Sequence, residues 1–284
     1  MSDGGQSEPI HKPRRNWADL GPRLASAIVL VALTATALAV GGYVFSALVG
    51  AVFAGVYREW ETMVTRAPPT IASWIMIVLV ACAGLVFPLA GVAGTATLIA
   101  FACGVAVVSG RDEIGWRMAG LVFLGVVVAA ALAMRGAGTA GIWAGLYLGT
   151  VVWMTDSAAF FTGRQIGGEK LAPDISPSKT WSGALGGLAL GTVAGTIVWT
   201  VVTDSPLWLG MLFSIAISVL GQLGDLAESA VKRRFRIKDS GDIIPGHGGL
   251  MDRLDSLTLG VIFLTVVGLL HAGQGAVAEG FLYW

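Results

Sequence analysis

Apolar residues along this chain come in long uninterrupted runs rather than in alternation with polar ones. Nine such runs follow a polar start, each close to the ~20 residues that an α-helix needs to cross the hydrocarbon core of a membrane. They span 23–40, 42–57, 70–87, 89–109, 116–134, 138–157, 183–202, 207–226 and 257–273. The pattern predicts an all-α, polytopic integral membrane protein with about nine transmembrane helices. Residues 1–20 are rich in Gly, Pro and Ser and are expected to form a disordered cytoplasmic tail.

Composition points the same way. Of the 284 residues, 55% are hydrophobic and only 13% are charged, whereas an average soluble domain carries about 25% charged residues. A soluble fold of this length would lack the polar surface to cover such a core. The formal net charge is zero, so no basic field favours nucleic acid as a partner. The expected partner of the outer surface is therefore the lipid bilayer.

Basic residues divide unevenly between the two sides that nine spans would create. With a cytoplasmic N-terminus, the inner segments are 1–22, 58–69, 110–115, 158–182 and 227–256, taken together with their immediate flanks, which add Arg23 and Arg117. They hold 17 of the 18 Lys and Arg residues, and only Arg135 lies outside. Cytoplasmic loops carry such an excess. We therefore expect a multi-pass protein of the cell (inner) membrane, with both large polar segments, 158–182 and 227–256, on the cytoplasmic side.

Small residues and the polar residues within the apolar pattern are also unevenly distributed, and both are frequent in the C-terminal half. The run GALGGLALGTVAGT (183–196) consists largely of residues that let helix backbones approach closely, which indicates a compact bundle. Polar residues within the apolar pattern are concentrated after residue 155. We therefore expect N-terminal transmembrane helices over 21–135 and a C-terminal catalytic transmembrane region over 136–284.

The densest polar segment begins where the eighth apolar run ends. On a helix, its polar residues would occupy positions i, i+3, i+4 and i+7 of one face; they are Asp225, Glu228, Ser229 and Lys232. A solvated helix end with salt bridges is one interpretation. A site is the other, because carboxylates at membrane depth usually face a cavity and bind something.

A loop and a second acidic group follow. KDSGDIIPGHGG has the composition of a loop, and Gly248 and Gly249 beside His247 would let backbone amides approach an anion. A plain loop role for the histidine remains an alternative. The DRLD run then supplies Asp252, Arg253 and Asp255. Asp225 and Asp252, from two helices, could together hold a divalent cation, and carboxylate oxygen is the ligand type that Mg²⁺ requires.

The segment 158–182 offers a second set of polar groups on the same side. Asp156 closes the sixth apolar run, and Arg164, Lys170 and Lys179 follow among Gly- and Pro-rich sequence. The sequence GxxxxGK[ST] of a P-loop is absent. Carboxylates for a metal together with many cations suit a polyphosphate–Mg²⁺ ligand. This combination favours direct phosphoryl or nucleotidyl transfer without a covalent enzyme intermediate.

The segment 229–255 resembles the signature of the phosphatidate cytidylyltransferase (CDP-diacylglycerol synthase) family. The matching pattern is SxVKRx4KDxGx2IPxHGGLxDRLD, without a gap over 27 residues. The resemblance extends to DSAAFFTGR (156–164) and KLAPDISPSKTWSG (170–183), whereas the N-terminal 130 residues are similar only in forming several helices. Ser182 stands where members of the family often carry Glu or Gln, and we assign it no role.

This resemblance implies the reaction CTP + phosphatidate → CDP-diacylglycerol + pyrophosphate, with Mg²⁺ as cofactor. It implies Asp225 and Asp252 as metal ligands. The candidate catalytic residues are Asp225, Asp252, Lys232, Arg233, Lys238, Asp239, His247, Arg253 and Asp255. The candidate substrate-binding residues are Asp156, Arg164, Ser176, Lys179, Thr180, Glu228, Ser229, Gly248 and Gly249.

Two rival functions have weaker support. CDP-alcohol phosphotransferases depend on a DGx2ARx8Gx3Dx3D run, which this sequence lacks. A transporter with Asp156 and Asp225 as coupling sites would predict matching polar breaks in both halves. The sequence leaves open whether a second cation such as K⁺ joins the site, whether the protein is a homodimer, and which acyl chains and which of CTP and dCTP it prefers.

Overall fold

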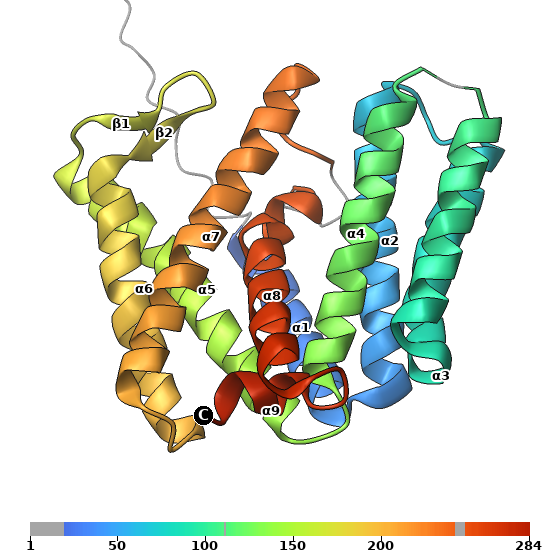
Figure 1. Ribbon diagram of the computed structural model, residues 1–284. Helices are drawn as coiled ribbons and strands as arrows, with labels where there is room; N and C mark the ends of the chain where they lie inside the picture. The colour runs from blue at the N-terminus through green and yellow to red at the C-terminus, as the bar shows by residue number, and fades with distance from the viewer. Residues whose placement is uncertain (1–19, 111, 242–247) are drawn as a thin grey trace, which may run out of the picture.

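The protein is a bundle of helices with one small β-hairpin (Figure 1). The computed structural model describes residues 20–110, 112–241 and 248–284, and side chains from residue 28 onward. The elements in order are α1 Leu20–Val40, α2 Gly42–Thr65, α3 Ile71–Val108, α4 Ile114–Arg135, α5 Ala140–Ile166, β1 Lys170–Ala172, β2 Ser176–Thr180, α6 Trp181–Val202, α7 Leu207–Arg234, α8 Met251–Ala272 and α9 Val277–Leu282. The all-α prediction is confirmed. The hairpin, in which β1 and β2 pair antiparallel, was not predicted, and the expected tail lies outside the described residues.

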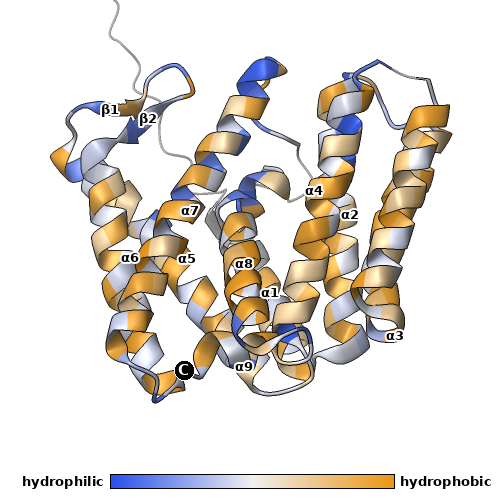
Figure 2. Ribbon diagram, in the orientation of Figure 1, coloured by the Kyte–Doolittle hydropathy of each residue, from blue (hydrophilic) through white to orange (hydrophobic). Residues whose placement is uncertain are grey.

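Apolar residues predominate along the helices of this bundle (Figure 2), and many of the large ones are exposed. Within the described residues, five helices are long and apolar enough to cross a membrane, namely α3, α4, α6, α7 and α8. In α6 only 22% of the most apolar window is buried inside the protein, and outward side chains such as Val201 are 75% exposed. Exposed apolar surface on this scale needs hydrocarbon as its solvent. The chain is therefore a multi-pass membrane protein.

The third and fourth apolar runs form two antiparallel arms of α3. The Thr95 hydroxyl donates to the carbonyl oxygen of Ala83 at 2.9 Å, although twelve residues of straight helix would span ~18 Å. The chain reverses at Gly91, whose φ of 57° and ψ of −149° interrupt the helix. A positive φ of this kind suits glycine because it has no Cβ. The two apolar runs predicted here are thus two helical arms joined by a tight turn.

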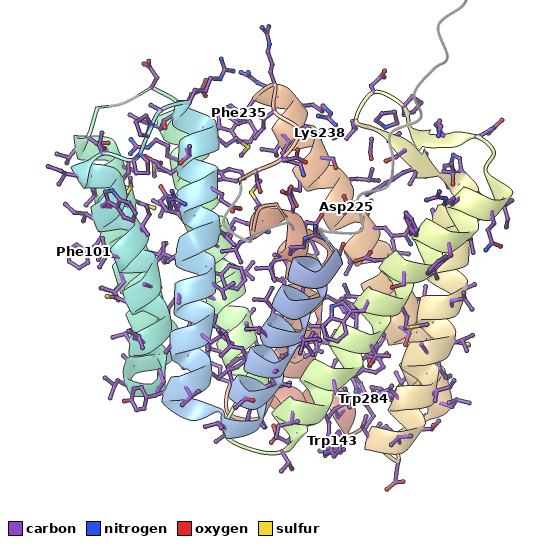
Figure 3. The ribbon with its side chains drawn as sticks, turned by 180° about the vertical axis from the view of Figure 1, so that it is seen from behind. Phe101, Trp143, Asp225, Phe235, Lys238 and Trp284 are labelled. Carbon is purple, nitrogen blue, oxygen red and sulfur yellow. The ribbon has the colours of Figure 1, made fainter. Side chains whose placement is uncertain are left out.

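The two ends of the bundle differ in chemistry. The β-hairpin, the end of α7 and the start of α4 lie at one end, and α9 lies at the other (Figure 1). We call these the hairpin end and the α9 end. Lys238 and Phe235 lie at the hairpin end, whereas Trp143 and Trp284 lie at the α9 end (Figure 3).

Close helix packing in the C-terminal half depends on glycine. One face of α6 buries Gly183, Gly187, Gly191 and Gly195 against its neighbours. A Cβ added at Gly187 would lie 2.7 Å from the backbone oxygen of Thr155 on α5. The sequence-based expectation that small residues allow close backbone approach is confirmed between α5 and α6.

Helix α2 extends further than its apolar run suggested. The segment 58–69 was expected to link two membrane spans on the inner side, but α2 continues to Thr65. The reason is that two of the charged residues after position 57 have partners inside the protein. Glu59 and Glu61 are 3% and 0% exposed, so their charges do not require the chain to leave the bundle. Helix α7 likewise continues to Arg234, eight residues beyond its apolar run.

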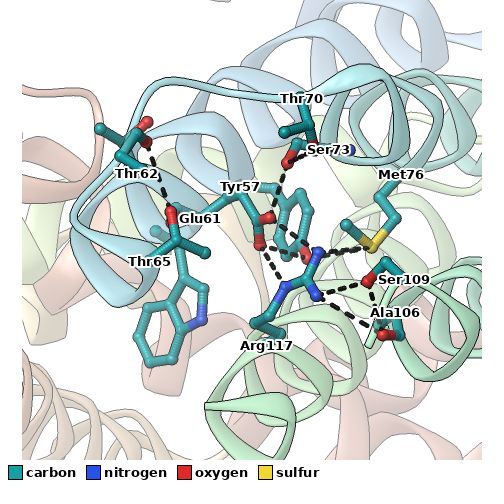
Figure 4. A network of polar contacts seen from close by, with 12 residues as sticks. Tyr57, Glu61, Thr62, Thr65, Thr70, Ser73, Met76, Ala106, Ser109 and Arg117 are labelled. Carbon is teal, nitrogen blue, oxygen red and sulfur yellow. Dashed lines mark hydrogen bonds and ion pairs between the residues drawn. The ribbon is translucent and has the colours of Figure 1, made fainter. Parts of the chain in front are cut away.

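Glu61 belongs to a buried polar network that joins α2, α3 and α4 (Figure 4). Arg117 of α4 donates through Nε to Glu61 Oε2 at 3.0 Å and through Nη2 to Glu61 Oε1 at 2.9 Å. Arg117 Nη1 donates to the Ser109 hydroxyl at 2.7 Å, and the Ser73 hydroxyl donates to Glu61 Oε1 at 2.8 Å. A two-point arginine–carboxylate pair is directional. The network therefore fixes α2 against both arms of α3 and the start of α4.

Arg135, the single cation outside the expected inner segments, has a structural role. Its Nε donates to the carbonyl of Leu38 at 2.5 Å, and its Nη2 donates to that of Ala39 at 3.2 Å. Its Nη1 donates to the carbonyls of Gly136 and Gly138 at 3.1 and 3.0 Å. Carbonyls at the end of a helix lack partners within it. Arg135 thus satisfies the last turn of α1 and the turn after α4.

Candidate active site

A cavity of about 650 Å³ opens where α5, β2, α6, α7 and α8 converge. Its wall contains most of the acidic residues predicted to carry chemistry and two of the cations. The predicted site residues that line it are Asp156, Arg164, Lys179, Thr180, Asp225, Asp252 and Asp255. These residues come from segments up to a hundred positions apart in the sequence. The structure thus brings the two polar segments 158–182 and 227–256 into one site.

Three helices each contribute a carboxylate to this wall. Asp156 lies on α5, Asp225 on α7 and Asp255 on α8. They lie close enough for Asp225 to repel the charges of both Asp156 and Asp255. Such repulsion is unfavourable unless a cation or a proton offsets it. The cavity therefore has an acidic side that favours a bound cation.

Cationic and polar groups from the β-hairpin and from the end of α5 line the cavity beside these acids. Lys179 Nζ lies 2.5 Å from Asp225 Oδ2 and forms an ion pair that joins β2 to α7. Thr180 is the N-cap of α6, and its hydroxyl oxygen accepts a hydrogen bond from Gly183 N at 3.1 Å. Arg164 at the end of α5 packs over the ring of Phe160 at 5.9 Å. Ser182, left without a role by the sequence, donates to the carbonyl of Gly167 and ties the first turn of α6 to the end of α5.

Asp252 is held on both of its oxygens. Lys232 Nζ lies 2.5 Å from Asp252 Oδ1. Asp252 Oδ2 accepts from Ser240 N at 3.1 Å, from the Ser240 hydroxyl at 2.9 Å and from Gly249 N at 3.2 Å. These bonds fix the carboxylate at the first turn of α8. In this structure, Asp252 is contacted by Lys232, a candidate catalytic residue, and by Gly249, whose backbone amide was expected to approach an anion.

The polar face of α7 agrees with its predicted helical spacing. Ser229 Oγ lies 3.4 Å from Asp225 Oδ1, and Lys232 Nζ lies 2.9 Å from Glu228 Oε1. Although this ion pair is short, neither oxygen of Glu228 receives a hydrogen bond with good geometry from the described residues. Glu228 also borders a smaller, largely apolar cavity of about 240 Å³ between α2, α4, α7 and α8. Glu228 therefore lies behind the acidic wall and not in the main cavity.

Several predicted residues lie outside the cavity wall. Ser176 is on β2, but it is the neighbouring Ser178 that lines the cavity. Arg233 is exposed and donates to the carbonyls of Ile175 and Ile237 at 3.2 and 3.0 Å. The exposed residues Lys238, Asp239 and Arg253 also lie away from this wall, as does Gly248, which has a φ of 77°. His247 lies outside the described residues, so its predicted role stays a prediction.

Two contributions were missed from the sequence. Ser256 lines the cavity, and its hydroxyl lies 3.4 Å from Asp156 Oδ1. Glu59 of α2 is bonded to the loop before α8 and to the first residue of α8. The position of Ser256 directly after the DRLD run is a weak sequence signal that it belongs to the site. No local pattern pointed to Glu59, because its partners lie about 190 residues away.

The acids of the cavity suit Mg²⁺ by donor type. Carboxylate oxygens face the cavity, and no cysteine or histidine is among its described lining residues. No group of three or more His, Cys, Asp or Glu residues in the described part of the chain is arranged to enclose a metal ion. Mg²⁺ is usually bound by one or two carboxylates together with substrate phosphates. Asp225 with a neighbouring Asp therefore fits the requirement.

Comparison with known proteins agrees with this description. Residues 22–271 match the model of the Cytidylyltransferase family. A phosphatidate cytidylyltransferase of Brucella suis biovar 1 is 37% identical over 263 residues, which cover 90% of this chain and 95% of that protein. Proteins of the same name from Bacillus subtilis and Haemophilus influenzae are 40% identical over 154 residues and 43% identical over 130. Those matches cover 54% and 44% of this chain, and 57% and 45% of the relatives.

These matches identify the protein as a nucleotidyltransferase, and its helical bundle carries a cavity lined by acidic and cationic residues. The chain belongs to the cytidylyltransferase family.

Proposed function

We propose that this protein is a phosphatidate cytidylyltransferase that converts CTP and phosphatidate into CDP-diacylglycerol and pyrophosphate with Mg²⁺. The observation that carries the proposal is the cavity in which Asp156, Asp225 and Asp255 face Lys179 and Arg164. Proteins of this name, such as that of Brucella suis, match nearly the whole chain.

The proposed step is a direct in-line transfer. A phosphate oxygen of phosphatidate forms a bond to the α-phosphorus of CTP, and the bond between the α- and β-phosphates breaks to release pyrophosphate. The attacking oxygen is already largely ionised near neutral pH, since the second pKa of a phosphomonoester is ~6. A strong general base is therefore unnecessary. No covalent enzyme intermediate forms.

Residues of the cavity would bind and orient two anionic substrates. Lys179 and Arg164 would neutralise phosphate charge, and a fixed arrangement of such groups lowers the barrier without reorganisation during the reaction. Asp225 and Asp252 would bind Mg²⁺, with Asp156 and Asp255 close by. When bound, Mg²⁺ would screen the repulsion between the substrates and stabilise the charge that develops on the phosphates. Lys232 would keep Asp252 oriented through their 2.5 Å ion pair.

We also propose nine membrane spans in the cell (inner) membrane, with the N-terminus and the hairpin end in the cytoplasm. The location of nearly all Lys and Arg residues supports this orientation. CTP would then reach the cavity from the cytosol, while the acyl chains of phosphatidate stay in the bilayer.

The test is incorporation of CTP labelled at the α-phosphate into lipid by purified protein. Wild-type protein is expected to form labelled CDP-diacylglycerol only when Mg²⁺ and phosphatidate are both present. Asp225→Asn and Asp252→Asn are each expected to lower turnover by about 100-fold or more, the scale of losing a group that stabilises transition-state charge.

Asp204→Asn provides the matched control, because Asp204 is exposed at the α9 end between α6 and α7. It should retain wild-type turnover. Full activity of Asp252→Asn would contradict the metal assignment. Absence of lipid product from well-folded wild-type protein would contradict the proposed reaction.

A further inference from the structure

We propose that Glu59, in the N-terminal half, is a positioning residue that holds the first turn of α8 and thereby orients the acidic side of the active site. The inference rests on the proposed function, since it assigns a role within that site. Glu59 lies on α2 and is 3% exposed. Its Oε1 accepts from Leu250 N at 2.9 Å, and its Oε2 accepts from Met251 N at 2.9 Å.

A carboxylate is well suited to this position. The first N–H groups of a helix have no partner within it, and a negative charge there is favourable. The N-cap residue of α8, Leu250, has no side chain that could satisfy these groups. Glu59 does so from another helix. It thus takes the role that Ser, Asp or Thr usually plays at a helix start.

Glu59 also connects to Asp252 through one hydroxyl group. Ser240 Oγ lies 3.0 Å from Glu59 Oε2 and 2.9 Å from Asp252 Oδ2. Since a hydroxyl has one proton, Ser240 can donate to only one of the two carboxylates at a time. The orientation of Asp252 is therefore linked to the charge and position of Glu59.

Glu59 is held in place by its neighbours along α2. Glu61 pairs with Arg117 in the buried network of Figure 4. Trp60 Nε1 donates to the carbonyl of Trp116 at 2.9 Å. These contacts fix α2 against α4, and α8 lies between α4 and α7 (Figure 1). The N-terminal half therefore supports the site directly, in addition to anchoring the chain in the membrane.

The experiment compares Glu59→Gln with Glu61→Gln, two buried glutamates separated by two positions on the same helix. In Glu59→Gln, the amide NH₂ would face backbone N–H or hydroxyl donors, and the charge would be lost. We expect the Mg²⁺ concentration for half-maximal activity to rise by about tenfold or more, the scale found when a group that orients a metal ligand is lost. Mn²⁺ affinity, measured by electron paramagnetic resonance without substrates, should weaken equally. Amide hydrogen exchange over 249–255 should speed up.

Glu61→Gln should lower the thermal unfolding temperature in detergent but leave the Mg²⁺ response, Mn²⁺ affinity and exchange over 249–255 as in wild type. Wild-type metal response and exchange in Glu59→Gln would overturn the proposal, as would identical profiles for the two variants. If Glu59→Gln does not fold, Glu59→Asp decides, because it keeps the charge but its shorter side chain withdraws the carboxylate from Leu250 N and Met251 N. Its Mg²⁺ requirement should rise severalfold, and an unchanged requirement would overturn the proposal.

Lack of CTP turnover in wild type would contradict the proposed function alone, since the Mn²⁺ and exchange readouts need no turnover.

Discussion

At the scale of single residues, the start of α8 shows how tightly one carboxylate can be held. Asp252 receives hydrogen bonds or an ion pair from Lys232, Ser240 and Gly249. Gly249 contributes in two ways, because its N–H bonds Asp252 and its missing side chain leaves room for Ser240. A Cβ at this position would overlap the Ser240 hydroxyl and would lie 2.7 Å from Glu59 Oε2. The glycine is thus needed for close packing around two acids.

Gly249→Ala is therefore expected to destabilise the site. Adding a methyl group to a packed interior costs about 1–3 kcal/mol, and here the shift displaces the groups that orient Asp252. Turnover should fall strongly, and the thermal unfolding temperature in detergent should fall modestly. Gly275→Ala is the matched control, since a Cβ at Gly275 would meet nothing within 4 Å. Equal activity of the two variants would contradict this interpretation.

At the scale of elements, the cavity depends on the fit of α5 against α6. Helix α5 carries Asp156, and α6 begins directly after the strand that carries Lys179. The buried glycine face of α6 lets the two backbones approach closely. Without a hydrophobic force between helices in lipid, such packing is a main source of association. The distance between the cationic hairpin and the acidic helices is thus set partly by glycines deep in the bundle.

Gly187→Leu should separate α5 from α6. The Cβ alone would lie 2.7 Å from the backbone oxygen of Thr155, and a backbone atom cannot move away as a side chain can. Turnover and thermal stability should both decrease. Gly104→Leu on α3 is the control, because nothing lies within 4 Å of its Cβ position, and its stability should change by no more than about 0.5 kcal/mol. A fully active Gly187→Leu variant would show that the α5–α6 distance does not matter.

At the scale of the whole molecule, the loops alternate between two ends. The turns before and after α3 and the hairpin lie at one end, and the links from α4 to α5 and from α6 to α7 lie at the other (Figure 1). The cationic groups of the site belong to the first end. Helix α8 lies between the N-terminal helices and α7, so both halves of the chain meet at the acidic residues. This arrangement makes the proposed membrane orientation testable.

Single cysteines at the two ends should react from opposite sides of the membrane. Cys82 and Cys103 are first replaced by Ala, and Asp174→Cys or Asp204→Cys is then introduced at exposed positions. A membrane-impermeant thiol reagent added to spheroplasts should label Asp204→Cys directly. Asp174→Cys, in the hairpin, should be labelled only after the membrane is opened. Labelling of both in intact spheroplasts would contradict the proposed topology.

The linear pattern was sufficient for the membrane class, the helical segments and the two polar segments of the site. This is because the apolar length of a span and the i, i+4 spacing of residues such as Asp225 and Ser229 are local properties. The resemblance of 229–255 to a family signature identified the family for the same reason, since the residues are contiguous.

Only the tertiary structure decided which of these residues face one another. It placed Asp156 and Asp255 beside Asp225, directed Lys232 to Asp252, and folded α3 back on itself at Gly91. It also brought Glu59 to the first turn of α8, a contact across about 190 residues. Local spacing carries no information about such pairs, because long-range contacts depend on how whole helices pack. Glu59 and Glu61 fall in a polar segment between two apolar runs of the sequence, but in the fold both are buried in α2, and Glu59 contacts the first turn of α8.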